Sequence, residues 1–136
     1  MMKSQIEAMR GAAYSTGARI DASHHAADEE AREAAGSRAE LITPIIKGWL
    51  TEAAQEITSI GVQIHGGMGF VEETGAAQHM RDARILPIYE GTTGIQAADL
   101  VGRKILRDEG REIRSMIAEM HQTADVMEQQ KGLTSM

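Results

Sequence analysis

The sequence contains no cysteine and few aromatic residues. Without cysteine the chain can form neither a disulfide nor a thiolate metal site, and this composition fits a reducing cytoplasm, where we expect the protein to be found. One Trp, two Tyr and one Phe are its only aromatic residues, and Ala, Ile, Leu and Met supply most of its apolar surface. This composition favours helix-on-helix packing over a β-sandwich.

Other absences exclude whole classes of function. No apolar run approaches the roughly 20 residues that a membrane-spanning helix needs, so we expect no stable membrane insertion. The net charge of −6 argues against nucleic acid as a partner. A di-iron helical bundle would need two Glu-x-x-His motifs. The nearest approach is Asp21-Ala-Ser-His24, and we expect no metal site.

What the sequence does contain is a strong apolar periodicity at three- and four-residue steps. It predicts long helices over residues 2–26, 38–65 and 111–129, with the widest apolar face on the second of them. Shorter helices are expected over residues 72–83 and 92–107. Together these elements predict an all-α, up-and-down helical bundle.

Charged residues, glycine and proline set the expected helix boundaries. Residues 27–37 carry charge without an apolar face, so we expect a solvated helix end and then a turn at Gly36-Ser37. Pro44 lacks a backbone donor and disturbs a helix interior. Either Thr43 caps a new helix, or one helix kinks at Pro44, and we favour the kink.

Residues 61–96 form the only stretch in which glycines, an isolated carboxylate and small hydroxyl residues gather at specific spacing. Its first half contains Gln63-Ile64-His65-Gly66-Gly67-Met68-Gly69-Phe70. Glycines there allow a sharp turn and the close approach of a ligand to main-chain N–H groups. A helix-terminating turn without a ligand is the alternative. The stretch does not fit G-x-G-x-x-G and no strand precedes it, which excludes a Rossmann site.

The second half, Ile88-Tyr89-Glu90-Gly91-Thr92-Thr93-Gly94, sets one carboxylate after an apolar run and before a predicted helix. A carboxyl in such surroundings can have its pKa raised and act as a general base. The alternative is a polar residue that the helix dipole favours at an N-terminus. Upstream, Arg81, Asp82 and Arg84 predict an ion-pair cluster that fixes the loop before Glu90, with phosphate binding as the alternative.

The order QIHGGMGF followed by MRDARILPIYEGTTGIQ resembles the C-terminal domain of acyl-CoA dehydrogenases, the FAD-dependent flavoenzymes of fatty-acid and amino-acid breakdown. Both motifs stand in the family's order and at its separation, joined by its MRDA segment. The resemblance implies a C-terminal helical bundle over residues 1–107 with the first bundle helix missing. Residues 108–136 would be an additional C-terminal helix and tail, as in the larger members.

The resemblance assigns the chemistry to Glu90. This residue matches the base that removes the α-proton of an acyl-CoA thioester, and its own N–H matches the group that holds the thioester carbonyl oxygen. Gly91 matches a residue that lines the substrate pocket. In the family, hydride leaves the β-carbon for flavin N5 and gives a trans-2-enoyl-CoA. The electrons then pass to an electron-transfer flavoprotein.

Matches to the family's FAD contacts fall in both motifs. Gln63, Gly66 and Gly67 match positions that hold the adenosine diphosphate end of FAD, in many members the FAD of a neighbouring subunit. A homo-oligomer is therefore implied. Thr92 matches a flavin-side contact. Gly94 stands where many members carry a larger polar residue, so this FAD contact departs from the family pattern.

The resemblance also implies that the chain belongs to a larger enzyme. Family members carry an N-terminal helical domain and a β-domain, which hold the isoalloxazine ring and much of the acyl-CoA, and this sequence has neither. We interpret the chain as the C-terminal fragment of an FAD-dependent acyl-CoA dehydrogenase, inactive on its own. The alternative hypothesis is a stand-alone helical protein-interaction module derived from that domain.

Overall fold

The computed structural model describes the backbone of residues 1–134 and the side chains of residues 1–130, and over that part of the chain every regular element is a helix. The prediction of an all-α fold is confirmed. The elements are α1 (Met2–His25), α2 (Glu29–Ile64), α3 (Gly67–Phe70), the 3₁₀ turn η1 (Glu72–Thr74), α4 (Ala76–Arg84), α5 (Thr93–Asp99), the π-helix η2 (Leu100–Ile105) and α6 (Arg111–Thr134).

The long central helix α2 begins earlier than the sequence predicted. Asp28 is its N-cap and accepts a hydrogen bond from the N–H of Ala31 at 2.7 Å. The expected turn at Gly36-Ser37 is wrong, because α2 runs through both residues. A Cβ placed on Gly36 would lie 3.6 Å from the Cβ of Ser23, so α1 passes close to α2 at this glycine. Packing against α1 thus keeps this segment helical despite its glycine.

Helix α2 also continues through Pro44, so the alternative of a new helix beginning at Thr43 is wrong. Proline leaves one carbonyl of the preceding turn without its usual donor. The hydroxyl of Thr43 donates to the carbonyl of Ala39 at 2.7 Å, which adds a local bond beside the gap. Pro44 itself is buried. Tertiary packing therefore overrides the local preference for a helix break.

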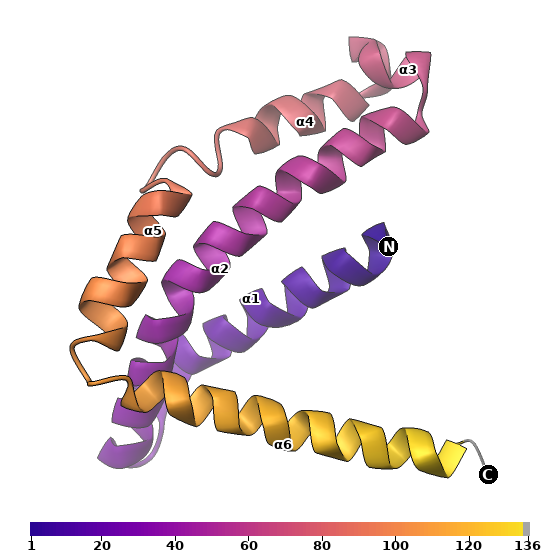
Figure 1. Ribbon diagram of the computed structural model, residues 1–136. Helices are drawn as coiled ribbons and strands as arrows, with labels where there is room; N and C mark the ends of the chain where they lie inside the picture. The colour runs from indigo at the N-terminus through magenta and orange to yellow at the C-terminus, as the bar shows by residue number, and fades with distance from the viewer. Residues whose placement is uncertain (135–136) are drawn as a thin grey trace.

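The helices form an open array around α2 (Figure 1). Helix α1 lies antiparallel to the first part of α2, while α4 and α5 follow one another along its other side. Apart from the two prolines, the buried apolar side chains among the described residues are those of Ala39, Leu41, Ile57 and Ala83. The accessible surface is 9598 Å², whereas a compact monomer of 14.7 kDa exposes about 6,900 Å². The described fold therefore exposes about 2,700 Å² more surface than a compact monomer of this mass.

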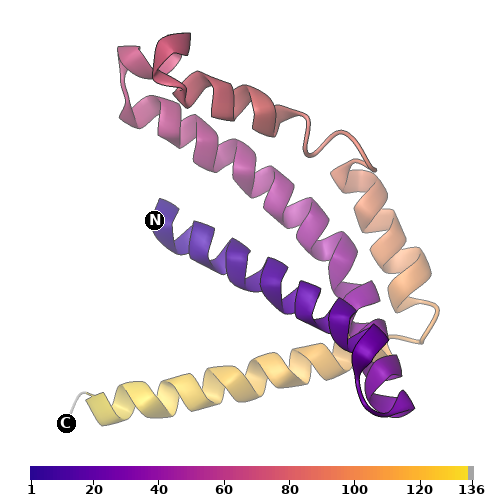
Figure 2. The same ribbon diagram turned by 180° about the vertical axis from the view of Figure 1, so that it is seen from behind.

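Helix α6 leaves the array and is tied to α2 by one buried arginine (Figure 2). Arg38 donates to the two carboxylate oxygens of Glu119 at 2.9 and 2.7 Å and also pairs with Glu112. The hydrogen bond with Glu119 raises the pKa of the Arg38 guanidinium, and the same bond lowers the pKa of the Glu119 carboxyl. The charged contact positions α6, since the apolar side chains of Met120 and Met127 remain exposed.

Candidate functional site

The segment that carries Glu90 joins α4 to α5 on one side of α2 (Figure 1), and side chains of α2 hold it at three points. Gln55 donates to the carbonyl of Ala83, where α4 ends. Glu52 accepts a hydrogen bond from the hydroxyl of Thr93 at 2.6 Å, where α5 begins. Lys47 binds the loop between them. Residues 83–93 are therefore fixed at both ends and in the middle.

Lys47 makes three hydrogen bonds to the backbone around Glu90. Its ammonium group donates to the carbonyl oxygens of Leu86 at 3.1 Å, Tyr89 at 2.9 Å and Gly91 at 2.5 Å. Lys47 is half-buried and forms no ion pair within the described part of the chain. The sequence reasoning missed this residue. The only available signal was a row of polar residues, Lys47, Thr51 and Gln55, at four-residue steps beside the apolar face of the helix.

Glu90 lies in a turn of unusual backbone geometry. Its φ angle is +56° and that of Gly91 is +90°. A non-glycine residue in this left-handed region costs roughly 1–2 kcal/mol, so contacts elsewhere must hold it there. Besides the two Lys47 bonds on either side, the carbonyl of Glu90 accepts a hydrogen bond from the side chain of Gln96 at 3.0 Å. Three consecutive carbonyls are thus fixed by side chains.

The groups of Glu90 that could act on a ligand are free. Its side chain is exposed, and its carboxylate has no hydrogen bond or ion pair with any described residue. The N–H groups of Glu90 and Gly91 have no acceptor among the described residues either. One carboxylate and two backbone donors are therefore available side by side. This combination can abstract a proton and stabilise the oxyanion that forms.

The glycine motif lies at the other end of α4 (Figure 1). Gln63 is about 24 Å farther along α2 than Lys47, at the rise of about 1.5 Å per residue in an α-helix. The structure groups Gly91, Thr92 and Gly94 with Glu90, all on the loop and first turn of α5. Gln63, Gly66 and Gly67 form a second, exposed group. The predicted site residues therefore form two separate patches.

The three glycines of the motif differ in what the fold requires of them. Gly66 has a φ of +60°, which ends α2 in a conformation that glycine adopts freely. A Cβ on Gly69 would lie 2.2 Å from the carbonyl oxygen of Val62, so only glycine fits there. A Cβ on Gly67 would meet nothing within 4 Å, and its φ is not positive. The fold therefore explains Gly66 and Gly69 and leaves the space at Gly67 open to a ligand.

The predicted ion-pair cluster before Glu90 is wrong. Arg81 pairs with Glu72 at 3.5 Å, while the carboxylate of Asp82 accepts a hydrogen bond from Gln78. Within the described residues, no ion pair joins Arg81, Asp82 and Arg84. The loop is held from α2 instead, by side chains that are distant in the sequence.

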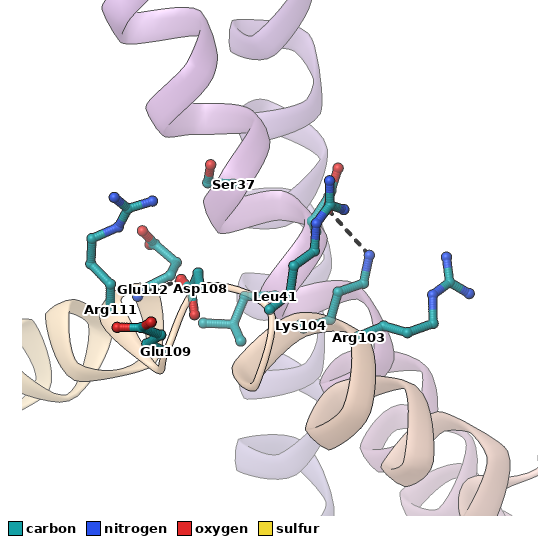
Figure 3. Close-up of a pocket in the computed structure, with 10 residues that line it drawn as sticks. Ser37, Leu41, Arg103, Lys104, Asp108, Glu109, Arg111 and Glu112 are labelled. Carbon is teal, nitrogen blue, oxygen red and sulfur yellow. Dashed lines mark hydrogen bonds and ion pairs between the residues drawn. The ribbon is translucent and has the colours of Figure 1, made fainter.

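A polar hollow of about 560 Å³ lies where α2, η2 and α6 meet (Figure 3). Arg103 and Lys104 line one side and Arg111 and Glu112 the other. The backbone N–H of Glu112 donates to Asp108 at 2.9 Å and lowers the pKa of that carboxyl. Four acidic and four basic side chains line the hollow, so its charge favours neither anions nor cations.

The described residues offer neither a metal site nor a helix that could span a membrane. No three His, Asp or Glu side chains come together as metal ligands. None of the helices in residues 1–134 combines the length and the apolar character that crossing a bilayer requires. The two patches at Glu90 and Gly67 are therefore the candidate sites that the sequence motifs and the geometry both indicate.

Comparison with known proteins supports the same motifs. Residues 1–106 match the family model described as acyl-CoA dehydrogenase, C-terminal domain. The 3-methylmercaptopropionyl-CoA dehydrogenase of Ruegeria pomeroyi is 59% identical over 113 residues, which are 83% of this chain and 19% of that protein. A butyryl-CoA dehydrogenase of Syntrophomonas wolfei is 37% identical over 120 residues, 88% of this chain and 20% of that protein.

A mammalian relative shares a shorter stretch at high identity. The mitochondrial short-chain specific acyl-CoA dehydrogenase of Sus scrofa is 54% identical over 52 residues, which are 38% of this chain and 13% of that protein. The chain spans about a fifth of the length of the Ruegeria pomeroyi and Syntrophomonas wolfei relatives. The predicted family is confirmed: this chain belongs to the acyl-CoA dehydrogenases and matches their C-terminal helical domain.

Proposed function

We propose that the chain supplies the catalytic base of an FAD-dependent acyl-CoA dehydrogenase, which oxidises an acyl-CoA thioester to a trans-2-enoyl-CoA. The observation that carries this proposal is the unpaired carboxylate of Glu90 on a loop tethered to α2. Glu90 takes the α-proton, and its N–H donates to the thioester oxygen as negative charge develops there. Gly91, with its free N–H, lines the substrate pocket beside the base.

The same chain provides part of the cofactor site. FAD, when bound, supplies the acceptor for the hydride that leaves the β-carbon. Thr92 would contact the flavin side, and Gly94 would offer only backbone there, because glycine has no side chain. Gln63, Gly66 and Gly67 would hold the adenosine diphosphate end. The exposed, unobstructed backbone at Gly67 fits that role.

The separation of the two patches supports an oligomer in which they serve different FAD molecules. With Gln63 about 24 Å from Lys47 along α2, the glycine patch suits the cofactor of a neighbouring subunit. The extra surface of about 2,700 Å² exceeds the roughly 800 Å² that each partner contributes to a standard interface. We expect the purified chain to self-associate. A monomeric mass in light scattering at every concentration would contradict this expectation.

The experiment uses a grafted enzyme, in which this chain replaces the matching segment of the Ruegeria pomeroyi relative. Acyl-CoA thioesters, including 3-methylmercaptopropionyl-CoA and butyryl-CoA, are mixed anaerobically with it, and flavin bleaching is followed by stopped flow. Glu90→Gln keeps the size of the side chain but cannot accept a proton, so bleaching should slow about 10²–10⁴-fold. FAD content should stay unchanged.

Glu73→Gln is the matched control, because Glu73 is also an exposed glutamate and lies in η1, away from the loop. It should bleach at the parental rate. If Glu90→Gln bleaches within a few-fold of the parent, Glu90 is not the base. A folded graft that retains FAD but is not bleached by any thioester would favour the interaction-module alternative.

In the complete reaction, an electron-transfer flavoprotein would reoxidise the flavin.

A further inference from the structure

We propose that Lys47 is a positioning residue for the reaction, and that it acts by orienting the Tyr89–Glu90 and Gly91–Thr92 peptide groups of the loop. This inference rests on the proposed function of Glu90. Lys47 lies on α2, while all three of its hydrogen-bond partners lie on the loop at residues 86–91. An ammonium group has three N–H donors, so these three carbonyls occupy all of them.

These hydrogen bonds determine the direction in which the N–H groups of Glu90 and Thr92 point. The peptide bonds are trans, and in a trans peptide the C=O and the following N–H point in opposite directions. Lys47 holds the carbonyl of Tyr89, so the N–H of Glu90 points away from Lys47. In the same way, the bond to Gly91 turns the N–H of Thr92 away from Lys47.

The two groups that Lys47 orients are those that the reaction uses. The N–H of Glu90 would stabilise the thioester oxygen, and Thr92 would contact the flavin. Lys47 also holds the Tyr89–Glu90 peptide just before the left-handed residue that bears the carboxylate, and the Gly91–Thr92 peptide one residue after it. Without these bonds each peptide can rotate, and Glu90 can leave its positive φ. Lys47 does not touch the reacting atoms and acts only through this backbone.

A purely structural role would give a different result from a positioning role. In the grafted enzyme, Lys47→Met should slow flavin bleaching about 10–100-fold, with little change in FAD content or in the substrate concentration that gives half-maximal rate. Proton abstraction should limit the rate more strongly, so the primary isotope effect with α-deuterated thioester should rise. Lys47→Arg keeps a cation with several donors and should recover at least about threefold over Lys47→Met.

Lys104→Met is the matched control. Lys104 is also half-buried, but it pairs with Glu40 at 3.3 Å and makes no hydrogen bond to the loop. It should leave bleaching and the isotope effect unchanged. In the 136-residue chain itself, hydrogen exchange at the hydrogen-bonded amides of Leu86, Ile88 and Tyr89 should accelerate at least about fivefold in Lys47→Met and stay unchanged in Lys104→Met.

The outcomes separate this inference from the function on which it rests. Parental bleaching in Lys47→Met together with slow bleaching in Glu90→Gln would overturn the role of Lys47 and leave Glu90 as the base. Parental bleaching in both variants would overturn the proposed function. If the Lys47→Met enzyme loses its FAD, flavin bleaching no longer tests the inference, and hydrogen exchange at the amides of Leu86, Ile88 and Tyr89 tests it instead. Unchanged exchange there contradicts the inference. Equal rates for Lys47→Arg and Lys47→Met also contradict it.

Discussion

The Glu90 loop and the glycine turn at Gly66–Gly69 both use left-handed backbone, yet different forces hold them. The glycine turn is stabilised locally: the N–H of Gly69 donates to Gly66 at 2.9 Å, and the backbone of Gly69 packs on Val62. The Glu90 loop is held from a distance, chiefly by Lys47. A local turn needs the right residue at one position. A tethered loop can carry a glutamate in a conformation that its own sequence does not favour.

The largest effect on stability should come from Gly69→Ala, which tests whether local contacts stabilise the glycine turn. The new Cβ would lie 2.2 Å from the carbonyl oxygen of Val62, and backbone must move to relieve that overlap. We expect a loss of about 3 kcal/mol in the free energy of unfolding. In a chain of this size, that loss lowers the melting temperature on the order of 10 °C. Thermal circular dichroism at 222 nm measures it, and an unchanged melting curve would contradict the local account.

Acidification should have an intermediate effect on stability. It should weaken the charged contacts that hold α6 but not the hydrogen bonds from Lys47 to the Glu90 loop. The folded pKa values of Glu119 and Asp108 are lowered, so the stability that they contribute is complete above their ordinary pKa values of about 4. It is lost as pH falls through the lowered folded values. Lys47 binds carbonyls, which do not titrate in this range. Helix α6 should therefore lose hydrogen-exchange protection at a higher pH than residues 86–93.

The control for this pH series is Arg38→Met, which removes the partner of Glu119. In that variant, protection of α6 should be weak at neutral pH and should depend less on pH between about 6 and 3. Exchange rates are compared by mass spectrometry after correction for the intrinsic effect of pH. Simultaneous loss of protection in α6 and in residues 86–93 would show that the two tethers do not differ.

The smallest effect on stability is expected from Gly67→Leu, because a Cβ there meets nothing within 4 Å and Gly67 is exposed. We expect the melting temperature to change by only about 1–2 °C. In the grafted enzyme, however, the same change should lower FAD content at least about tenfold, since it blocks close approach to the backbone. Normal FAD content in a folded Gly67→Leu enzyme would remove this patch from the cofactor site.

The same contrast explains what the sequence could predict. The helical class, the approximate extent of α1 and the acyl-CoA dehydrogenase family follow from periodicity and from two local motifs. The start of α2 at Glu29 was missed because packing against α1 keeps Gly36 helical. Lys47 was missed because its partners lie 39 to 44 residues later in the chain. Local patterns carry no information about such a pairing.

The central claim is that Glu90 removes the α-proton, and it can be measured without any redox step. An acyl-CoA analogue with sulfur in place of the β-carbon has an acidic α-proton but cannot release hydride. In D₂O, the grafted enzyme should exchange the α-protons of this analogue, as followed by NMR. Exchange should be at least about 100-fold slower in Glu90→Gln and unchanged in Glu73→Gln. Exchange at the parental rate in Glu90→Gln would contradict the account.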